Sequence, residues 1–414
     1  MPPSNKHTPA SHVPSPDKRG IQNKSKSKHS PLKPEVPAFL LFLRTMSLKA
    51  LTGKFFPSSL PPADAFAGQR VIVTGGTAGL GLATAIHFLK LGADEVIITA
   101  RSASSARAEG ARQKILAAAG QGADKSTAGR VSIMELDMNS YASCVAFVEA
   151  VKERFGAADG PDVIVFNAGV TNSQFRRSPE GMEEIIQVNT LSTTFLALLL
   201  VPWMKQQRGQ RSSPARVVFV SSGLHMSVDI RPWSTYAEKE GGVLAHYSKE
   251  ENFEAGLTSP MYNYSKLLLM YALEEVSKMA LDQNGEPQII VTSVCPGPVK
   301  TELSRSMQEN SILARIAAPI FMNLVGKSPD YGARIYLAGA LAEPAAHGKF
   351  LRDYLTDPQY ASRSAPVLAS KEARLMQAQI WKEIREALSS KVPAAREVLL
   401  RPATAGAQDA RERG

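Results

Sequence analysis

The sequence predicts an α/β fold built on a doubly wound parallel sheet. Short apolar runs, typical of buried parallel strands, recur along the chain, and helical stretches separate them. The first run leads through a glycine-rich turn directly into a helix. A chain of 414 residues could hold one large α/β domain or two small ones. This alternation favours a single domain over residues 46–392, with disordered tails over 1–45 and 393–414.

The charge of the chain is concentrated at its N-terminus. Ten Lys and Arg residues stand against Asp17 and Glu35 within residues 1–60, so this segment carries most of the net charge of +10. The remaining chain is close to neutral, which gives no support for nucleic-acid binding. The two cysteines, Cys144 and Cys295, lie far apart in apolar surroundings and imply no disulfide framework. These features favour a reducing, cytoplasmic location.

Residues 37–56 differ from the Pro-, Ser- and Lys-rich tail before them. They combine apolar residues with interspersed Arg and Lys. An interfacial membrane helix has this composition, and so does a short helix docked on the domain. Membrane association through this segment is therefore left open. The sequence after Met46 resembles the start of an enzyme more than the sequence after Met1 does. This suggests that translation starts at Met46. No apolar run approaches the ~20 residues of a membrane-spanning helix.

The glycine-rich turn follows a strand at 70–73 and precedes a helix at 82–89. Glycines at 75, 79 and 81 allow a tight turn, a close approach to a pyrophosphate, and packing of the helix on the sheet. The N-terminus of the helix offers free N–H groups and a positive dipole end to phosphates. The pattern also occurs in an ordinary strand–turn–helix connection, but the flanking elements favour nucleotide binding.

The second strand, at 95–100, ends at Arg101 and Ser102. NAD-specific proteins place an acidic residue near this point to bind the ribose hydroxyls, and here there is none. A guanidinium matches the geometry of a 2′-phosphate, so these residues favour NADP. The alternative is a solvated loop arginine.

The next elements each end on a polar residue. After a helix at about 103–119, a strand at 131–136 ends at Asp137, which could also serve as the N-cap of a helix at 139–155. A strand at 162–166 ends in Asn167-Ala168-Gly169. Asn189 lies in the following apolar helix, where Asn is a mediocre helix former, which suggests a polar task. The rest of that helix is core or an oligomer interface.

A fifth strand, at 216–220, leads into Ser221-Ser222 at the sheet edge where open α/β folds place reactive groups. Tyr262 and Lys266 are four residues apart and share one helix face. A phenol is a poor acid or base at neutral pH, and a nearby ammonium together with a positive nicotinamide lowers its pKa. The other tyrosines of this region lack a cation four positions later: Tyr236, Tyr247 and Tyr264.

A sixth strand, at 289–294, ends in Cys295-Pro296-Gly297-Pro298-Val299-Lys300-Thr301. No histidine adjoins Cys295 in sequence, so its thiol is expected to pack as a small apolar group. A helix at about 330–342, a strand at 347–351 and a helix at 370–390 complete the predicted domain.

In this order the motifs resemble the classical branch of the short-chain dehydrogenase/reductase family, over about residues 66–357. The resemblance is nearest to retinol-dehydrogenase-like and fungal secondary-metabolism reductases. It implies a Rossmann-like fold and four catalytic residues: Asn189, Ser222, Tyr262 and Lys266. The implied cofactor contacts are Gly75, Thr77, Gly79, Leu80, Gly81, Arg101, Ser102, Asp137, Asn167, Gly169, Tyr262, Lys266, Val299 and Thr301. The implied substrate contacts are Ser222, Leu224, His225 and Tyr262.

The implied roles are specific. Ser222 polarises the substrate oxygen and Tyr262 is the acid/base. Lys266 binds the nicotinamide ribose, and the Asn189 region holds a water that relays protons to Lys266. Phe166 stands where the family has an asparagine. No metal site is expected.

Ser222 and Tyr262 lie 40 positions apart, farther than is usual in the family. We interpret the insertion, residues 224–261, as a long substrate lid carrying bulky residues: Trp233, Tyr236, Tyr247 and Phe253. His225 is expected to be a wall of the pocket. The apolar segment 303–327 is expected to fold over the same site. Two such covers predict a small hydrophobic ketone or alcohol as substrate.

The sequence therefore predicts an NADP(H)-dependent oxidoreductase that interconverts a hydrophobic ketone and its secondary alcohol. The alternative is a dinucleotide-sensing regulatory protein that keeps the fold without turnover. Such proteins usually lose the Tyr or the Lys, and this chain has both. A homo-oligomer is left open.

Overall fold

The computed structural model describes residues 58–118, 120, 130–156, 160–254, 260–301, 325–392 and 396, all within one compact unit, Met46–Gly414. Several predictions lie outside the described residues. They are the two tails, the segment 37–56, the proposed start at Met46, and nearly all of the covering segment 303–327.

A seven-stranded sheet, parallel throughout, lies at the centre of the fold, in the order β3-β2-β1-β4-β5-β6-β7. Its strands are β1 Arg70–Val73, β2 Glu95–Ala100, β3 Val131–Glu135, β4 Val163–Phe166, β5 Ala215–Val220, β6 Ile289–Cys295 and β7 Phe350–Arg352. The inner strands are apolar on both faces because helices cover both sides. The strand order reverses between β1 and β4, so their carboxyl ends open a crevice where ligands bind in such sheets. The predicted fold class is confirmed.

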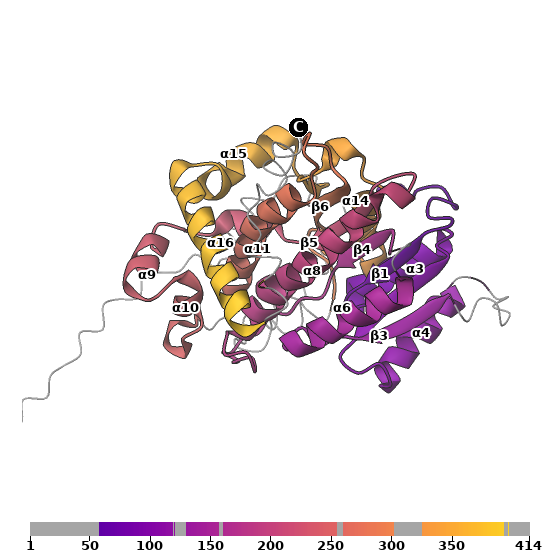
Figure 1. Cartoon of the computed structure of the whole chain (residues 1–414), viewed down its shortest axis with the longest axis horizontal. Helices are drawn as coiled ribbons and strands as arrows, with labels where there is room; N and C mark the ends of the chain where they lie inside the picture. Colours follow the sequence, from indigo (N-terminus) through magenta and orange to yellow (C-terminus); the bar gives the residue numbers. More distant parts are fainter. Residues whose placement is uncertain are drawn as a thin grey trace, which may run out of the picture. The chain divides into compact units, whose positions relative to one another are not determined.

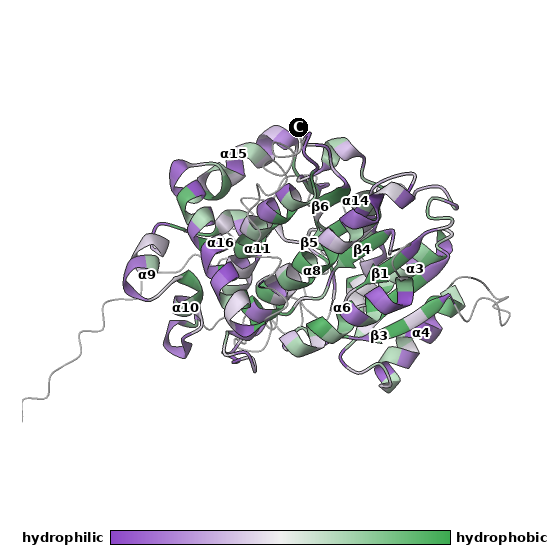
Figure 2. Ribbon diagram, in the orientation of Figure 1, coloured by the Kyte–Doolittle hydropathy of each residue, from purple (hydrophilic) through white to green (hydrophobic). Residues whose placement is uncertain are grey.

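Helices form a layer on each face of the sheet (Figure 1). One apolar cluster joins the sheet to α3 Gly79–Lys90, α4 Ala106–Ala118 and α14 Pro329–Ala340. The larger cluster joins it to α6 Tyr141–Phe155, α8 Thr193–Gln206 and α11 Pro260–Met279. Figure 2 shows hydrophobic residues concentrated on the strands, while the outer helices carry hydrophilic faces. The predicted helices at these positions are confirmed to within a few residues.

The expectation that no apolar run approaches the length of a membrane span is wrong, because the stretch Glu184–Gln206 is long and apolar enough by length and composition alone. This stretch comprises α7 Glu184–Ile186, a π-helical turn η1 Gln187–Ser192, and α8. Within the described residues, 89% of its most apolar window is buried inside the protein. It packs against α6 and α11 and is therefore a core helix.

The C-terminal helices are α15 Asp357–Leu368 and α16 Lys371–Lys391, and α16 packs on α11. The insertion contributes η3 Gly223–Ser227, α9 Trp233–Lys239, α10 Val243–Tyr247 and η4 Glu250–Asn252. Figure 1 shows α9 and α10 beside α16, and the backbone N–H of Leu244 donates to a Glu383 carboxylate oxygen of α16 at 2.9 Å. The insertion is thus joined to the C-terminal helix.

The aromatic residues of the insertion differ from the expectation that they cover the substrate. Trp233 is fully buried, and its indole N–H donates to the Tyr247 hydroxyl at 2.9 Å. Tyr247 stacks on Tyr264, two positions beyond Tyr262 and so on the opposite face of α11. Trp233 and Tyr247 are therefore core residues between α11 and α16, because large apolar rings find more burial there than over an open site.

Candidate active site

The glycine-rich turn between β1 and α3 has the geometry of a phosphate cradle. Gly75 and Gly79 have φ values of +66° and +54°, which favour glycine. A Cβ on Gly81 would lie 2.4 Å from the Gly75 carbonyl oxygen. No side chain caps the start of α3 at Ala78, and its first turn has no acidic residue. The first N–H groups of α3 thus keep their capacity to bind an anion.

A network of side chains holds this turn against the end of β4. The Thr74 hydroxyl oxygen accepts from the backbone N–H groups of Asn167 and Ala168 at 2.9 and 3.0 Å. The Asn167 amide donates to the carbonyls of Thr74 and Gly75 at 2.8 and 3.3 Å. Asn167, expected to contact the cofactor, therefore braces the cradle through its side chain. Thr74 is a functional residue that the sequence reasoning missed, although it directly precedes the glycines.

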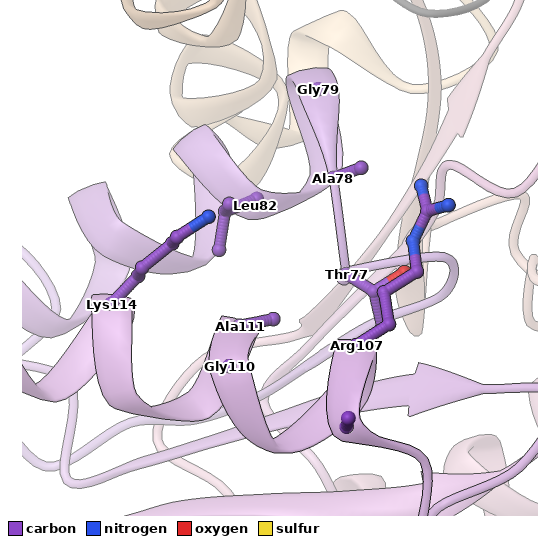
Figure 3. Close-up of a pocket in the computed structure, with 9 residues that line it drawn as sticks. Thr77, Ala78, Gly79, Leu82, Arg107, Gly110, Ala111 and Lys114 are labelled. Carbon is purple, nitrogen blue, oxygen red and sulfur yellow. The ribbon is translucent and has the colours of Figure 1, made fainter.

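A cleft of about 470 Å³ opens between the start of α3 and α4 (Figure 3). Its lining includes Thr77 and Gly79 of the turn and two cations of α4, Arg107 and Lys114, whose side chains extend toward α3. The sequence reasoning did not single out these cations. Their spacing of seven residues, which places both on one helix face, was the available signal. Arg101 and Ser102 are exposed at the end of β2 and are not among the lining residues.

The remaining predicted cofactor residues lie around the same crevice. Asp137 is half-buried and its Oδ1 accepts from Asn139 N at 3.0 Å, while Ser140 caps α6. The alternative role of Asp137 as N-cap is therefore wrong. A Cβ on Gly79 would lie 3.5 Å from the Thr301 methyl group, and one on Gly332 would lie 2.6 Å from Val299 and 2.8 Å from Leu80. The segment after β6 thus reaches the glycine turn.

Asn189 lies in the π-helical turn η1, a distortion frequent at functional sites. Its Oδ1 accepts from Val170 N at 2.8 Å, and its amide donates to Val170 O at 2.9 Å and to the Ser265 hydroxyl at 3.1 Å. Ser265 in turn donates to the Tyr262 carbonyl at 2.8 Å. A Cβ on Gly169 would lie 3.1 Å from Asn189 Oδ1. Asn189 therefore joins the end of β4 to the first turn of α11.

Three of the predicted catalytic side chains converge at the end of β5. Ser222 lies two residues beyond the end of this strand, and its hydroxyl faces that of Tyr262, whose pKa it lowers. Lys266, one turn along α11, is 4% exposed and donates to the Val220 carbonyl at 2.8 Å. Its Nζ lies 5.5 Å from the centre of the Tyr262 ring. The arrangement places two half-buried hydroxyl residues beside a buried cation.

The pKa values of Tyr262 and Lys266 bear on the expectation that the ammonium lowers the pKa of the phenol. Burial raises the pKa of Tyr262, and only its hydrogen bond with Ser222 opposes this shift. Burial also lowers the pKa of Lys266 to about 8. The ammonium does not depress the phenol pKa here, because it is bound to Val220 O and lies over the ring rather than at the hydroxyl. The expected lowering of the Tyr262 pKa, which also invoked a positive nicotinamide, stays a prediction.

Two residues of η3 were expected beside the substrate. Leu224 is half-buried, and its N–H donates to the Ser222 hydroxyl oxygen at 3.3 Å. His225 is fully buried, with both ring nitrogens bonded to protein groups. It is therefore not a wall of the pocket but lies within the core behind Ser222. Cys295 is buried, and its sulfur accepts from Gly223 N and the Tyr354 hydroxyl, both at 3.3 Å, so it packs as expected.

The helix that carries Asn189 begins at a buried carboxyl group. Glu183 is fully buried, and its Oε2 accepts from the N–H groups of Ile185 and Ile186 at 2.8 and 3.1 Å. Burial raises the pKa of Glu183 to about 7. The folded state therefore favours the protonated acid, whereas the unfolded chain ionises near 4.5. The difference in the Glu183 pKa therefore stabilises the folded state fully below about pH 4.5. This stabilisation is lost as the pH rises toward 7.

Glu183→Gln is expected to remove this pH dependence, because glutamine resembles the protonated acid and still caps the helix. Between about pH 5 and about pH 8, wild type should lose on the order of 2–3 kcal/mol of unfolding free energy that the variant keeps. Urea unfolding at both pH values measures the difference. Glu149→Gln, at an exposed carboxylate, is the control. An equal pH response of the two variants would contradict the assignment.

The chain is similar to several known proteins. The profile of the family described as short chain dehydrogenase matches residues 69–243, which end within the insertion. The chain is 30% identical to the short-chain dehydrogenase/reductase ffsI of Aspergillus flavipes, over 83% of this chain and 94% of that protein. It is also 30% identical to the short-chain dehydrogenase/reductase phmF of Phaeosphaeria nodorum, over 79% of this chain and 88% of that protein. A crystal structure of an uncharacterized protein from Mycobacterium paratuberculosis shares the fold, with a TM-score of 0.51 and 23% identity, over 80% of this chain and 96% of that one.

Proposed function

Because the chain belongs to the short-chain dehydrogenase/reductase family of oxidoreductases, we propose that it reduces a hydrophobic ketone to its secondary alcohol with NADPH, and catalyses the reverse oxidation. The observation that carries this proposal is the convergence of Ser222, Tyr262 and Lys266 at the carboxyl end of β5, where the Ser222 hydroxyl lowers the Tyr262 pKa. Two hydroxyl groups that meet at one point can both donate to a carbonyl oxygen placed there. Such a pair polarises the carbonyl and supplies a proton.

The residues around the crevice fit a nicotinamide dinucleotide. The uncapped start of α3 and the cradle that a Cβ on Gly81 would fill suit a pyrophosphate. When bound, the reduced nicotinamide supplies a hydride, with its electron pair, to the substrate carbonyl carbon. Lys266, buried one turn from Tyr262, would bind the nicotinamide ribose. Tyr262 transfers its proton to the carbonyl oxygen, so that the alcohol carries one new C–H and one new O–H bond.

The electrostatics of the chain support the reductive direction. A proton donor must hold its proton until the carbonyl oxygen develops negative charge. Burial keeps the Tyr262 phenol protonated, and the reduced nicotinamide carries no positive charge that would oppose this. Oxidation needs the phenolate, which the positive ring of the oxidised cofactor favours.

We propose NADP rather than NAD as the cofactor, bound by Arg101 and Ser102 after β2 and by the α4 cations of the cleft. Arg107→Ala and Arg101→Asp are each expected to weaken NADPH binding by roughly 10- to 100-fold, because a charge-assisted hydrogen bond contributes about 1.5–3 kcal/mol. NADH binding should change little. Titration of each cofactor against protein fluorescence measures both constants.

Arg112→Ala is the matched control, since Arg112 lies on the same helix but pairs with Glu109 and is not among the lining residues. An equal loss of NADPH and NADH affinity in the Arg107 and Arg101 variants would contradict the preference for NADP. Tighter NADH than NADPH binding by the wild type would also do so.

The enzyme assignment is tested by following NADPH oxidation across a series of aliphatic and aromatic ketones. We expect turnover that increases with the apolar surface of the ketone. NADPH binding without turnover of any ketone or alcohol would instead favour the dinucleotide-sensing alternative.

A cytoplasmic location with a membrane contact through 37–56 is part of the proposal. Deleting residues 1–56 should shift the protein from the membrane to the soluble fraction, and an unchanged distribution would remove the contact.

A further inference from the structure

A buried histidine lies directly behind the proposed catalytic serine. The His225 ring is fully buried in η3, between α11 and α15. Its Nδ1 lies 2.7 Å from the Ser222 carbonyl oxygen, and its Nε2 lies 3.2 Å from the Tyr360 hydroxyl of α15. The edges of Phe350 and Tyr360 enclose the ring, with centroids 5.1 and 5.9 Å away. The histidine therefore connects the serine backbone to α15.

The two hydrogen bonds determine the tautomer of this histidine. A carbonyl oxygen only accepts, so Nδ1 must carry the proton that it donates to Ser222. Nε2 then has a lone pair and accepts from the Tyr360 hydroxyl. Burial lowers the pKa of His225 to about 4, consistent with a neutral ring. The ring thus has a single orientation and a single protonation state.

The other end of the same peptide unit is also held. The Gly223 N–H, which follows the Ser222 carbonyl, donates to the Cys295 sulfur at 3.3 Å, and the Tyr354 hydroxyl donates to that sulfur at 3.3 Å. A Cβ on Gly223 would lie 2.1 Å from the Tyr354 hydroxyl oxygen. A peptide plane bonded at both its C=O and its N–H cannot rotate. Its orientation fixes ψ of Ser222.

On the premise of the function proposed above, we propose that His225 and Tyr360 are positioning residues for Ser222. They hold the Ser222–Gly223 peptide plane, and this plane directs the serine hydroxyl to the point where it meets Tyr262. Catalytic hydroxyls must be held within a fraction of an ångström, since a misplacement of about 1 Å costs roughly 100-fold in rate. The C-terminal segment thereby supports a serine 135 or more residues earlier in the chain.

The test compares two tyrosine variants. Each removes one hydroxyl that makes a hydrogen bond between α15 and another part of the chain. Tyr360→Phe removes the bond to His225, and Tyr271→Phe removes one to the Val367 carbonyl at 2.8 Å, away from Ser222. Tyr360→Phe should lower kcat for ketone reduction about fivefold, the effect of one hydrogen bond, with an unchanged Kd for NADPH. Tyr271→Phe should lower Tm without lowering kcat.

Substitution of the histidine provides the rescue experiment. His225→Leu keeps the volume and the backbone N–H that donates to the Ser222 carbonyl at 3.2 Å, but it removes the side-chain donor, so kcat should fall further than in Tyr360→Phe. His225→Asn places an amide N–H near the position of Nδ1 and should recover part of the loss. Equal kcat in the Tyr360 and Tyr271 variants, or no recovery by asparagine relative to leucine, would overturn the proposal.

Hydrogen exchange distinguishes failure of this proposal from failure of the proposed function. If the wild type reduces no ketone, the proposed function is wrong. The positioning role of His225 and Tyr360 still predicts faster amide exchange in residues 222–227 of Tyr360→Phe than of Tyr271→Phe. Equal exchange in the two variants would overturn the positioning itself.

Discussion

Tyr262→Phe is expected to reduce kcat for ketone reduction by about 10²- to 10⁴-fold, the usual contribution of a general acid. The variant keeps the ring, so its packing and the neighbouring Lys266 stay in place. It loses only the hydroxyl that meets Ser222 and carries the transferable proton. The Kd for NADPH should stay near that of wild type. Steady-state kinetics and a fluorescence titration of NADPH measure the two quantities.

The matched control is Tyr264→Phe on the same helix. Tyr264 lies on the opposite face of α11, where its hydroxyl contacts Glu254 at 3.3 Å and its ring stacks on Tyr247. This variant should keep kcat. Full activity of Tyr262→Phe would assign the proton to another group and would remove the mechanism proposed here. An equal loss in both variants would instead indicate damage to the helix.

Gly81→Ala is expected to weaken NADPH binding by roughly 10- to 100-fold, because overpacking a tight site costs about 1–3 kcal/mol. The new methyl group would lie 2.4 Å from the Gly75 carbonyl oxygen and 2.5 Å from the Asn167 amide nitrogen. Both belong to the network that holds the phosphate cradle, so the turn must move. Calorimetric titration with NADPH measures the loss, and Tm shows how much folding stability is lost with it.

Gly209→Ala serves as the control for this substitution. A Cβ at Gly209 would have no atom within 4 Å, and the residue does not have a positive φ. It should leave both NADPH affinity and Tm unchanged. Wild-type affinity in the Gly81 variant would show that the turn yields without consequence, and that the cradle is not where the cofactor binds.

Most of the fold was predictable because each buried strand is a continuous apolar run ending at a turn residue. The strands that carry the site, β1, β4, β5 and β6, begin and end within about a residue of the prediction. Helix α15 was missed, since Pro358 and Pro366 argue against a helix in sequence. Pro358 lies in the first turn, where proline is tolerated, and a capping box formed by Thr356 and Gln359 supports the start.

The sequence predicted which residues form the candidate site, but it did not predict the contacts that each of them makes. Ser222, Tyr262 and Lys266 meet as their positions at the end of β5 and on one face of α11 require. The ammonium bond to Val220 O and the raised phenol pKa depend on burial, which no local pattern encodes. The role of Asn167 as a brace was hidden for the same reason.

By itself the sequence determined the parallel sheet, the phosphate cradle and the identity of the reactive side chains, because these follow from local apolar runs, glycine spacing and helical periodicity. Only the tertiary structure decided that Trp233 and Tyr247 of the insertion pack against α11 and that His225 lies behind Ser222. It also decided that Tyr360 supports that histidine. The contact between His225 and Tyr360 joins residues 135 positions apart, and such a pairing depends on which surfaces bury one another.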